Sequence, residues 1–427
     1  MPNFSGMWTI QAQMQAKSQG LWSLQGDNGL WLWGYNNNGE LGQGDITSRS
    51  SPVQVGALTT WSKIACGGGR TIATKTDGTL WTWGRNNYGQ LGQGDVTYRS
   101  SPVQVGALTT WLNIAGGSGH TIATKTDGTL WTWGMNNQGK LGQGDTTYRS
   151  SPVQVGALTT WSNIAGGGSH TIATKTDGTL WLWGYNNHGQ LGQGDTTHRS
   201  SPVQVGALTT WSNIACGAYH NIATKTDGTL WTWGYNAYGQ LGLGDVTHRS
   251  SPVQVGALTT WLNIAGGDYH TIATKTDGTL WSWGYNPYGQ LGQGDITRRS
   301  SPVQVGALTT WLNIAGGTYH TIATKTDGTL WSWGYNYFGQ LGQGNTDNFV
   351  SPVQVGALTT WLNIASGPRN TIATKTDGTL WSWGRNNYGQ LGQGDITYRS
   401  SPVQVGALTT WSKIAGGHGH TIAFTSA

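Results

Sequence analysis

The chain has 427 residues, of which only 10% are charged, whereas glycine (69 residues) and tryptophan (26 residues) are abundant. This composition favours short strands, tight turns and aromatic packing, and it excludes an intrinsically disordered chain. The net charge of +5 is spread along the chain without any run of Lys or Arg, so nucleic acid is not an expected partner.

Residues 1–26 form a leader that precedes the repeated part of the chain. Residues 11–19 have helical composition and Gly20 is a C-terminal stop signal, which predicts a short helix. The leader lacks the basic and apolar segments of a Sec signal, and the chain has no run of about 18 apolar residues. We therefore expect a soluble protein without membrane insertion, and leave its location open between cytoplasm and virion.

From residue 27 onward the chain repeats with a period of 50 residues. The stretch TLWTWGRNNYGQLGQGD at 79–95 appears eight times in near-copy, from 29–45 to 379–395. A fixed period of this length indicates a solenoid, a propeller or an array, in which neighbouring units cover one another's apolar faces. We expect residues 27–427 to form a single domain.

Each repeat contains four strand candidates, which in the second copy are 61–67, 71–76, 79–84 and 101–105. Asp77-Gly78 predicts a two-residue type I′ hairpin turn, so the second and third strands should be antiparallel neighbours. Pro102 cannot donate a ladder hydrogen bond, which places the fourth strand at an edge. Four antiparallel strands per repeat describe the blade of a β-propeller.

Tryptophan supports this architecture. The columns of Trp61, Trp81 and Trp83, together with Trp8 and Trp22, account for all 26 tryptophans. Trp81 and Trp83 point to the same side of their strand, where they can fill the space between stacked blades. Core packing is a simpler explanation of these columns than a ligand site.

The order of the strands predicts how the ring closes. The repeats begin with a third and a fourth strand (29–34, then 51–55) and end with a first and a second strand (411–417 and 421–427). Joining these halves gives one composite blade, removes the open edges and yields eight blades. The segment LWSLQG at 21–26 could compete with 421–427 for its place in that blade.

Cys66 and Cys216 share one repeat column but stand three repeats apart, so they should not form a disulfide. Gly or Ser occupies this column in other copies (Gly116, Gly166 and Ser366), which indicates a slot for a small residue rather than a redox or metal site.

The segment GSGHTIATKTDGTLWTWGMNNQGKLGQGD at 117–145 resembles the repeat of the regulator of chromosome condensation family. Shared features are the Gly-x-x-His-Thr strand, the Asp-Gly turn, the Trp-Gly pair and Gly-Gln-Leu-Gly. The resemblance implies a propeller closed by its two chain ends, usually with seven blades, so eight would be a departure. The leader, SGMWTIQAQMQAKSQGLW at 5–22, weakly resembles the leaders of phage and virion-surface proteins.

The functions known in that family range from nucleotide exchange on a small GTPase to light sensing and protein binding, so the fold alone does not select one. The exchange factor uses an inserted wedge, for which the strict spacing leaves no room, and the ultraviolet photoreceptor uses a Trp that the loops before the His column lack. Residues of that column lie on different blades, too far apart for Zn–N bonds of about 2.1 Å. We therefore predict no enzyme, no metal and no cofactor.

Comparison of the eight copies separates constant from variable positions. SPVQVGALTTW is identical in all of them, whereas the connections between first and second strands and between third and fourth strands vary. In an antiparallel blade these two connections emerge on the same face. Neutral drift at exposed sites would explain the variation, but the equally exposed turns of the opposite face have not drifted, and the changes favour Tyr, His, Arg, Phe and Asn.

The sequence thus predicts a monomeric, non-enzymatic propeller that presents a diversified face to a protein or to a surface glycan, with attachment of a phage or virion as one setting. A purely structural scaffold and a GTPase or chromatin regulator are the alternatives. The predicted binding residues are Tyr35, Arg85, Tyr88, Tyr185, His188, Tyr219, Tyr235, Tyr238, Tyr269, Tyr285, Tyr288, Tyr319, Tyr335, Tyr337, Phe338, Arg385 and Tyr388.

Overall fold

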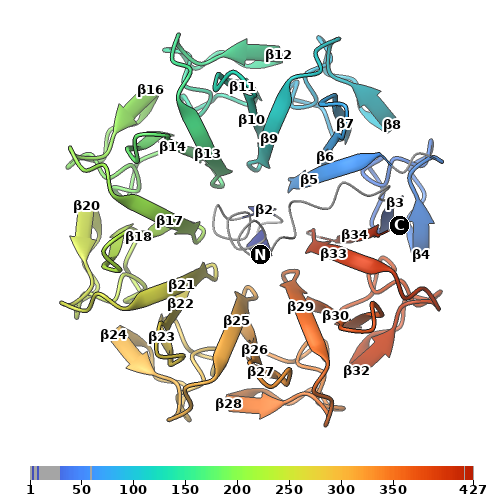
Figure 1. The fold of residues 1–427 in the computed structure, drawn as a ribbon, viewed down its shortest axis with the longest axis vertical. Coiled ribbons are helices and arrows are strands. Elements are labelled where there is room, and N and C mark those ends of the chain that lie inside the picture. Colours follow the sequence, from blue (N-terminus) through green and yellow to red (C-terminus); the bar gives the residue numbers. More distant parts are fainter. Residues whose placement is uncertain (1, 4–6, 9–28, 58–59, 418, 427) are drawn as a thin grey trace.

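The computed structural model describes residues 2–3, 7–8, 29–57, 60–417 and 419–426. The described part of the repeats is all β and forms a ring of eight four-stranded antiparallel sheets (Figure 1). The eight-bladed propeller predicted from the repeat is therefore confirmed. The helix predicted at 11–19 and the competing segment at 21–26 lie outside the described residues.

The blade that carries the second repeat shows the arrangement. Its strands are β5 (Trp61–Gly67), β6 (Arg70–Lys75), β7 (Leu80–Gly84) and β8 (Arg99–Gln104), paired in that order. The first strand lies nearest the central axis and the fourth, which carries the proline, lies at the periphery (Figure 1). A proline is tolerated there because an edge strand needs fewer ladder hydrogen bonds.

The other complete blades repeat this order. Their strands are β9 (Trp111–Gly116), β10 (His120–Lys125), β11 (Leu130–Gly134) and β12 (Arg149–Gln154); β13 (Trp161–Gly166), β14 (His170–Lys175), β15 (Leu180–Gly184) and β16 (Arg199–Gln204); β17 (Trp211–Cys216), β18 (His220–Lys225), β19 (Leu230–Gly234) and β20 (Arg249–Gln254); β21 (Trp261–Gly266), β22 (His270–Lys275), β23 (Leu280–Gly284) and β24 (Arg299–Gln304); β25 (Trp311–Gly316), β26 (His320–Lys325), β27 (Leu330–Gly334) and β28 (Phe349–Gln354); β29 (Trp361–Ser366), β30 (Asn370–Lys375), β31 (Leu380–Gly384) and β32 (Arg399–Gln404).

The composite blade closes the ring as the strand order predicts. It consists of β33 (Trp411–Gly416), β34 (His420–Thr425), β3 (Gly29–Gly34) and β4 (Arg49–Gln54). The register between the chain ends runs from Gly29 opposite Thr425 to Gly34 opposite His420. Both termini of the repeated part therefore belong to one sheet.

Two short strands of the leader pair with each other inside the ring. They are β1 (Pro2–Asn3) and β2 (Met7–Trp8), and they are antiparallel. The backbone of β2 lies against β5, β9 and β13, and that of β1 lies against β25 and β29. This part of the leader thus occupies the central channel (Figure 1).

The turn between the second and third strands differs from the prediction. A type I′ turn requires positive φ at both central residues, but no non-glycine residue of the described chain has positive φ. Instead, Gly78 N donates to Lys75 O, and Gly78 alone is left-handed with φ of 77°. This is a type I turn followed by a left-handed glycine. Asp77 is satisfied by the amide and hydroxyl of Thr79, so it has no need of a left-handed backbone.

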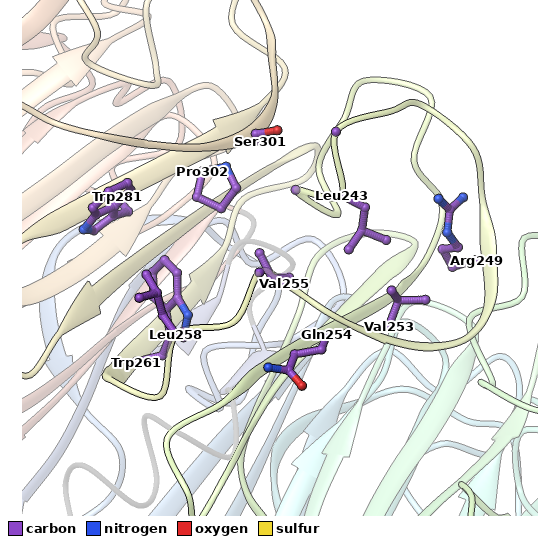
Figure 2. Close-up of a pocket in the computed structure, with 13 residues that line it drawn as sticks. Leu243, Arg249, Val253, Gln254, Val255, Leu258, Trp261, Trp281, Ser301 and Pro302 are labelled. Atoms are coloured by element: carbon purple, nitrogen blue, oxygen red, sulfur yellow. The ribbon is translucent and has the colours of Figure 1, made fainter.

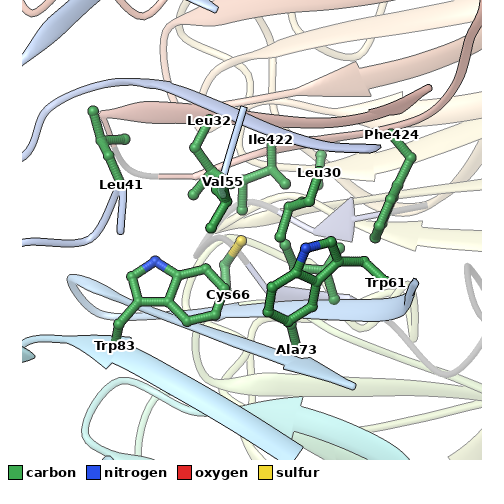
Figure 3. Packing of buried hydrophobic residues seen from close by; sticks show 12 residues of the cluster. Leu30, Leu32, Leu41, Val55, Trp61, Cys66, Ala73, Trp83, Ile422 and Phe424 are labelled. Carbon is green, nitrogen blue, oxygen red and sulfur yellow. The ribbon is translucent and has the colours of Figure 1, made fainter. Parts of the chain in front are cut away.

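The hydrophobic core lies between blades, with one cluster of buried side chains at each of the eight junctions. Figure 3 shows the junction at the composite blade, where Leu30 and Leu32 face Trp61 and Trp83 of the next blade. Trp83 is fully buried, and its indole N–H donates to the carbonyl of Glu40 at 2.9 Å. Tryptophan therefore joins neighbouring blades by apolar contact and by a hydrogen bond.

Both cysteines belong to these clusters. Cys66 and Cys216 are buried and are not joined by a disulfide, as the repeat column predicts. Burial raises the pKa of each thiol to about 12, so both remain protonated and unreactive at neutral pH.

Candidate functional site

The two variable connections of each blade lie together. The amide of Tyr235, which follows the third strand, donates to the carbonyl of Tyr219, which precedes the second strand, at 3.0 Å, and equivalent bonds recur around the ring. The preceding blade also contributes, since Gly119 lies beside Met135 of its own blade and Tyr88 of the blade before. We call the surface formed by these two sets of connections the variable face.

A buried asparagine shapes each loop between third and fourth strands. In the loop of β23 and β24, the amide group of Asn286 donates to the carbonyls of Asp295 and Thr297 and accepts from the amide of Leu291. Asn286 is fully buried, and the same contacts recur in six other copies. The loop therefore keeps one backbone path while its exposed residues change.

An ion pair braces the outer part of the same loop. Arg99 and Asp95 approach to 2.5 Å, and equivalent pairs occur in six other copies. The amide of Thr97 and the guanidinium of Arg99 hold the pKa of Asp95 below its usual value. The pairs are half-exposed, so each contributes little to stability. They are local contacts within one loop.

The predicted aromatic residues form a continuous arc of touching rings. Tyr238 and Tyr269 of adjacent blades lie 5.3 Å apart between ring centroids, and Tyr288 and Tyr319 lie 5.2 Å apart. These are separations at which aromatic rings attract one another. The arc comprises Tyr185, His188, Tyr219, Tyr235, Tyr238, Tyr269, Tyr285, Tyr288, Tyr319, Tyr335, Tyr337 and Phe338.

Arginines extend the arc toward the composite blade. The guanidinium of Arg385 lies 5.6 Å from the ring of Phe338 and 5.8 Å from that of Tyr388. Tyr388 in turn contacts Tyr35 at 4.8 Å. Of the predicted residues, Arg85 and Tyr88 stand outside this chain of contacts and pair with each other at 5.8 Å.

The arc includes residues that the sequence comparison did not select. His248 lies 5.2 Å from His188 and 4.8 Å from Tyr235, and Tyr398 lies 5.6 Å from Phe338. Arg369 covers Phe338 from a neighbouring blade at 5.2 Å, and Asp268 precedes Tyr269 in the loop. All four occupy columns that vary between the copies, so the sequence variation could have selected them. Only the packing of the blades shows that they lie at the arc.

The histidine column is structural. His120 Nε2 lies 2.9 Å from Thr171 Oγ1 on the next blade, and His220 Nε2 lies 3.1 Å from Thr271 Oγ1. Burial lowers the pKa of His220 to about 3, so its ring is neutral. Among the described residues, no three His, Cys, Asp or Glu side chains are grouped to hold a metal ion. Nor does that part of the chain include a helix able to span a membrane.

A cavity of about 500 Å³ opens between two blades (Figure 2). Leu243, Val253 and Val255 line one side, and Trp261, Trp281 and Pro302 line the other. Leu243 replaces a glutamine of the other copies, whose amide donates to the carbonyl of the fourth strand, as Gln293 does to Val303. None of the predicted binding residues lines this cavity.

Comparisons with known proteins agree with this architecture. The RCC1-like domain model matches residues 149–362, and models of the regulator of chromosome condensation (RCC1) repeat match 27–74, 77–124 and 377–424, with a second repeat model matching 61–90, 111–140 and 361–390. No curated protein sequence matches the chain significantly.

Solved propellers resemble the chain in fold. A crystal structure of human WBSCR16 is 20% identical with a TM-score of 0.65, and the match covers 94% of this chain and 99% of that one. The structure of Prp20p from Saccharomyces cerevisiae was described with its binding properties to Gsp1p and histones. It is 19% identical with a TM-score of 0.67, and the match covers 94% of this chain and 92% of that one. The structure of yeast RCC1 (Prp20) bound to Kap60 is 19% identical with a TM-score of 0.66, and the match covers 94% of this chain and 89% of that one. Identities this low relate these proteins in fold alone.

Proposed function

Because this chain belongs to the regulator of chromosome condensation (RCC1) repeat family, we propose that it is a non-enzymatic recognition protein whose variable face binds a partner macromolecule. The observation that carries this proposal is the arc of touching rings, built from positions that differ between otherwise near-identical repeats. Aromatic residues give large contact areas at low entropic cost, which suits a binding face.

The exposure of the arc supports binding rather than core packing. Tyr219 is 40% exposed and Tyr337 is 67% exposed, whereas Trp233 and Trp333 in the blades beneath them are fully buried. Exposed rings held in place by neighbouring rings are pre-organised, so a partner would not have to order them.

A protein is the partner we favour, and a surface glycan is the second, since rings also stack on sugars. The yeast relative Prp20p was described with its binding to Gsp1p and histones, which is a precedent for protein recognition on this fold. A setting on a phage or virion surface rests on the leader resemblance alone.

The test compares two surface variants with the native protein on protein and glycan arrays. In one variant Tyr269, Tyr288, Tyr319 and Tyr337 become Ser; in the control, Leu158, Leu208, Leu308 and Leu358, exposed in the constant connections, become Ser. We expect the tyrosine variant to lose ligands that the leucine variant keeps. Equal binding by all three proteins would leave only a structural scaffold.

The regulatory alternative has its own assay. Nucleotide exchange measured against a panel of small GTPases would be accelerated by a family regulator, whereas we expect no acceleration. The even spacing of the repeats leaves no inserted wedge that would reach into a GTPase.

A further inference from the structure

Asp268 is the one carboxylate in its column of the variable face. The equivalent residues of the other copies are Gly68, Ser118, Gly168, Ala218, Thr318, Pro368 and His418. Asp268 lies in the loop between β21 and β22, where its carboxylate accepts a hydrogen bond from the side chain of Thr318 on the next blade. Its carbonyl accepts from the amide of Ala218 on the blade before, at 3.4 Å. The residue is thus held between three blades.

Three tyrosine rings lie together beside the loop that carries this carboxylate. The ring of Tyr285 lies 6.2 Å from that of Tyr269 and 6.2 Å from that of Tyr319, so it bridges two blades. Burial, followed by the charge of Asp268, raises the pKa of Tyr269 to about 12 and also raises that of Tyr319. The carboxylate is therefore close enough to act on both phenols.

Elsewhere on the variable face, the protein supplies its own cations to aromatic rings. Arg369 and Arg385 cover Phe338, and Arg85 covers Tyr88. Among the described residues, no Lys or Arg covers Tyr269, Tyr285 or Tyr319 in this way, although the charge of Arg369 acts to lower the pKa of Tyr319. Every ion pair found in that part of the chain joins Asp and Arg of one outer loop.

Partial burial makes Asp268 a strong acceptor for an incoming cation. Loss of solvent raises its pKa to about 6, so the group is mostly ionised at neutral pH yet poorly hydrated. A cation that meets both a carboxylate and the faces of tyrosine rings gains charge pairing and cation–π attraction together. A neutral sugar hydroxyl would leave that charge uncompensated.

We infer that Asp268, with the rings of Tyr269, Tyr285 and Tyr319, forms a subsite that takes the cationic side chain, arginine or lysine, of the protein partner. This inference rests on the proposed function and gives the partner a chemical requirement. A protein side chain fits better than a free small cation because the subsite is continuous with an arc that spans several blades.

The first test uses Nα-acetyl-arginine amide as the probe and its neutral isostere, Nα-acetyl-citrulline amide, as the control, with binding measured by ligand-observed NMR at pH 7.5. We expect the arginine derivative to bind and the citrulline derivative not to bind. Asp268→Asn should weaken the arginine derivative by about tenfold, the loss of one charge-assisted contact. Unchanged binding in Asp268→Asn would overturn the inference.

A matched variant separates the subsite from general charge. Adding Ser118→Asp to Asp268→Asn restores the net charge on a blade that has Gly119 and Met135 in place of tyrosines. We expect this double variant to bind as weakly as Asp268→Asn. Recovery of native affinity would show that the rings have no part in the subsite and would overturn it.

The array experiment keeps this inference distinct from the proposed function. Loss of a protein ligand in the tyrosine variant but full retention in Asp268→Asn would leave the recognition face standing and remove the subsite. Loss in both variants, with the ligand's affinity also reduced by substituting one of its arginines or lysines, is the expected result.

Discussion

His120 Nε2 lies 2.9 Å from Oγ1 of Thr171 on the next blade. Thr171 gives its own proton to the carbonyl of Lys140, at 2.7 Å, so it must accept from His120, which therefore carries its proton on Nε2. The histidine is fully buried, and burial, followed by the charge of Lys140, lowers its pKa well below the usual value. A neutral histidine thus links each of several blade pairs.

This link makes stability depend on pH. The pKa is lowered to about 4 for His170 and about 3 for His220, whereas a histidine of the unfolded chain titrates near 6.5. Between these values the unfolded chain binds more protons, so the free energy of unfolding falls as the pH drops from 7 to 4. Each histidine contributes at most about 1.4 kcal/mol per pH unit.

Urea unfolding of the native protein and of His220→Asn at pH 7.5 and pH 5.0 measures this dependence. Asparagine already occupies the column at Asn370, so the variant should fold. We expect a smaller loss of stability on acidification in His220→Asn. If the native protein and the variant lost the same free energy of unfolding between pH 7.5 and pH 5.0, His220 would not titrate on unfolding.

Arg70 occupies the same repeat column as these histidines, and we expect it to destabilise the folded protein. It is fully buried, and burial lowers its pKa to about 9, so it remains charged at neutral pH. Its guanidinium donates to the carbonyls of Gly117 and His120 and to the hydroxyl of Thr121, but Nη1 has no partner, and no ion pair found among the described residues compensates the charge. A buried, uncompensated charge is costly.

Arg70→His should therefore stabilise the protein by about 1–3 kcal/mol, because it introduces the neutral residue found in six of the other copies. Thr121 donates to the carbonyl of Gln90 and accepts from Nε of Arg70, so removal of the guanidinium leaves its oxygen able to accept from the new ring. The midpoint of urea unfolding is the measurement, and a lower midpoint in the variant would contradict the prediction.

Ring closure gives a matched pair of core substitutions. Ile422 of the composite blade and Ile222 of a continuous blade are both fully buried in equivalent clusters. If the composite blade is as tightly packed as the others, Ile422→Ala and Ile222→Ala should each cost about 2–5 kcal/mol. A clearly smaller cost for Ile422→Ala, measured by urea unfolding, would mean that the ends of the chain open before the rest.

Much of the fold follows from the sequence because the repeat period, the edge proline and the order of strands are local or countable features. The predicted type of the hairpin turn was wrong because the dipeptide Asp77-Gly78 is compatible with two turn types. The amide and the hydroxyl of Thr79 both donate to the Asp77 carboxylate, and these bonds favour the turn type with a single left-handed residue.

The candidate site was predicted less completely. Variation between copies selects positions but does not show which side chains meet, since contacts such as His188 with His248 join residues of different repeats. Asp268 is one acidic residue in a variable column, and only its partly buried position between blades distinguishes it from an ordinary loop residue. The contact of β2 with β5 likewise depends on the closed ring.

Asn286 lies at the base of the loop that carries Tyr285 and Tyr288. Asn286 is fully buried and satisfies the amide of Leu291 and two carbonyls, whereas Asp295 forms a half-exposed ion pair. Asn286→Ala leaves buried groups without partners, so we expect it to cost about 2–4 kcal/mol. Asp295→Asn should change stability by less than about 1 kcal/mol, because exposed pairs contribute little and an asparagine oxygen can still accept from the Thr297 amide.

Urea unfolding together with hydrogen exchange of the loop amides at 285–299 distinguishes the two variants. Asn345 provides the natural control for Asp295→Asn, since its side chain accepts from the amide of Asp347 at 3.1 Å in the copy that has no ion pair. We expect fast exchange and weaker partner binding in Asn286→Ala only. Equal exchange in both variants would mean that the ion pair, rather than the buried asparagine, holds Tyr285 and Tyr288 in place on the variable face.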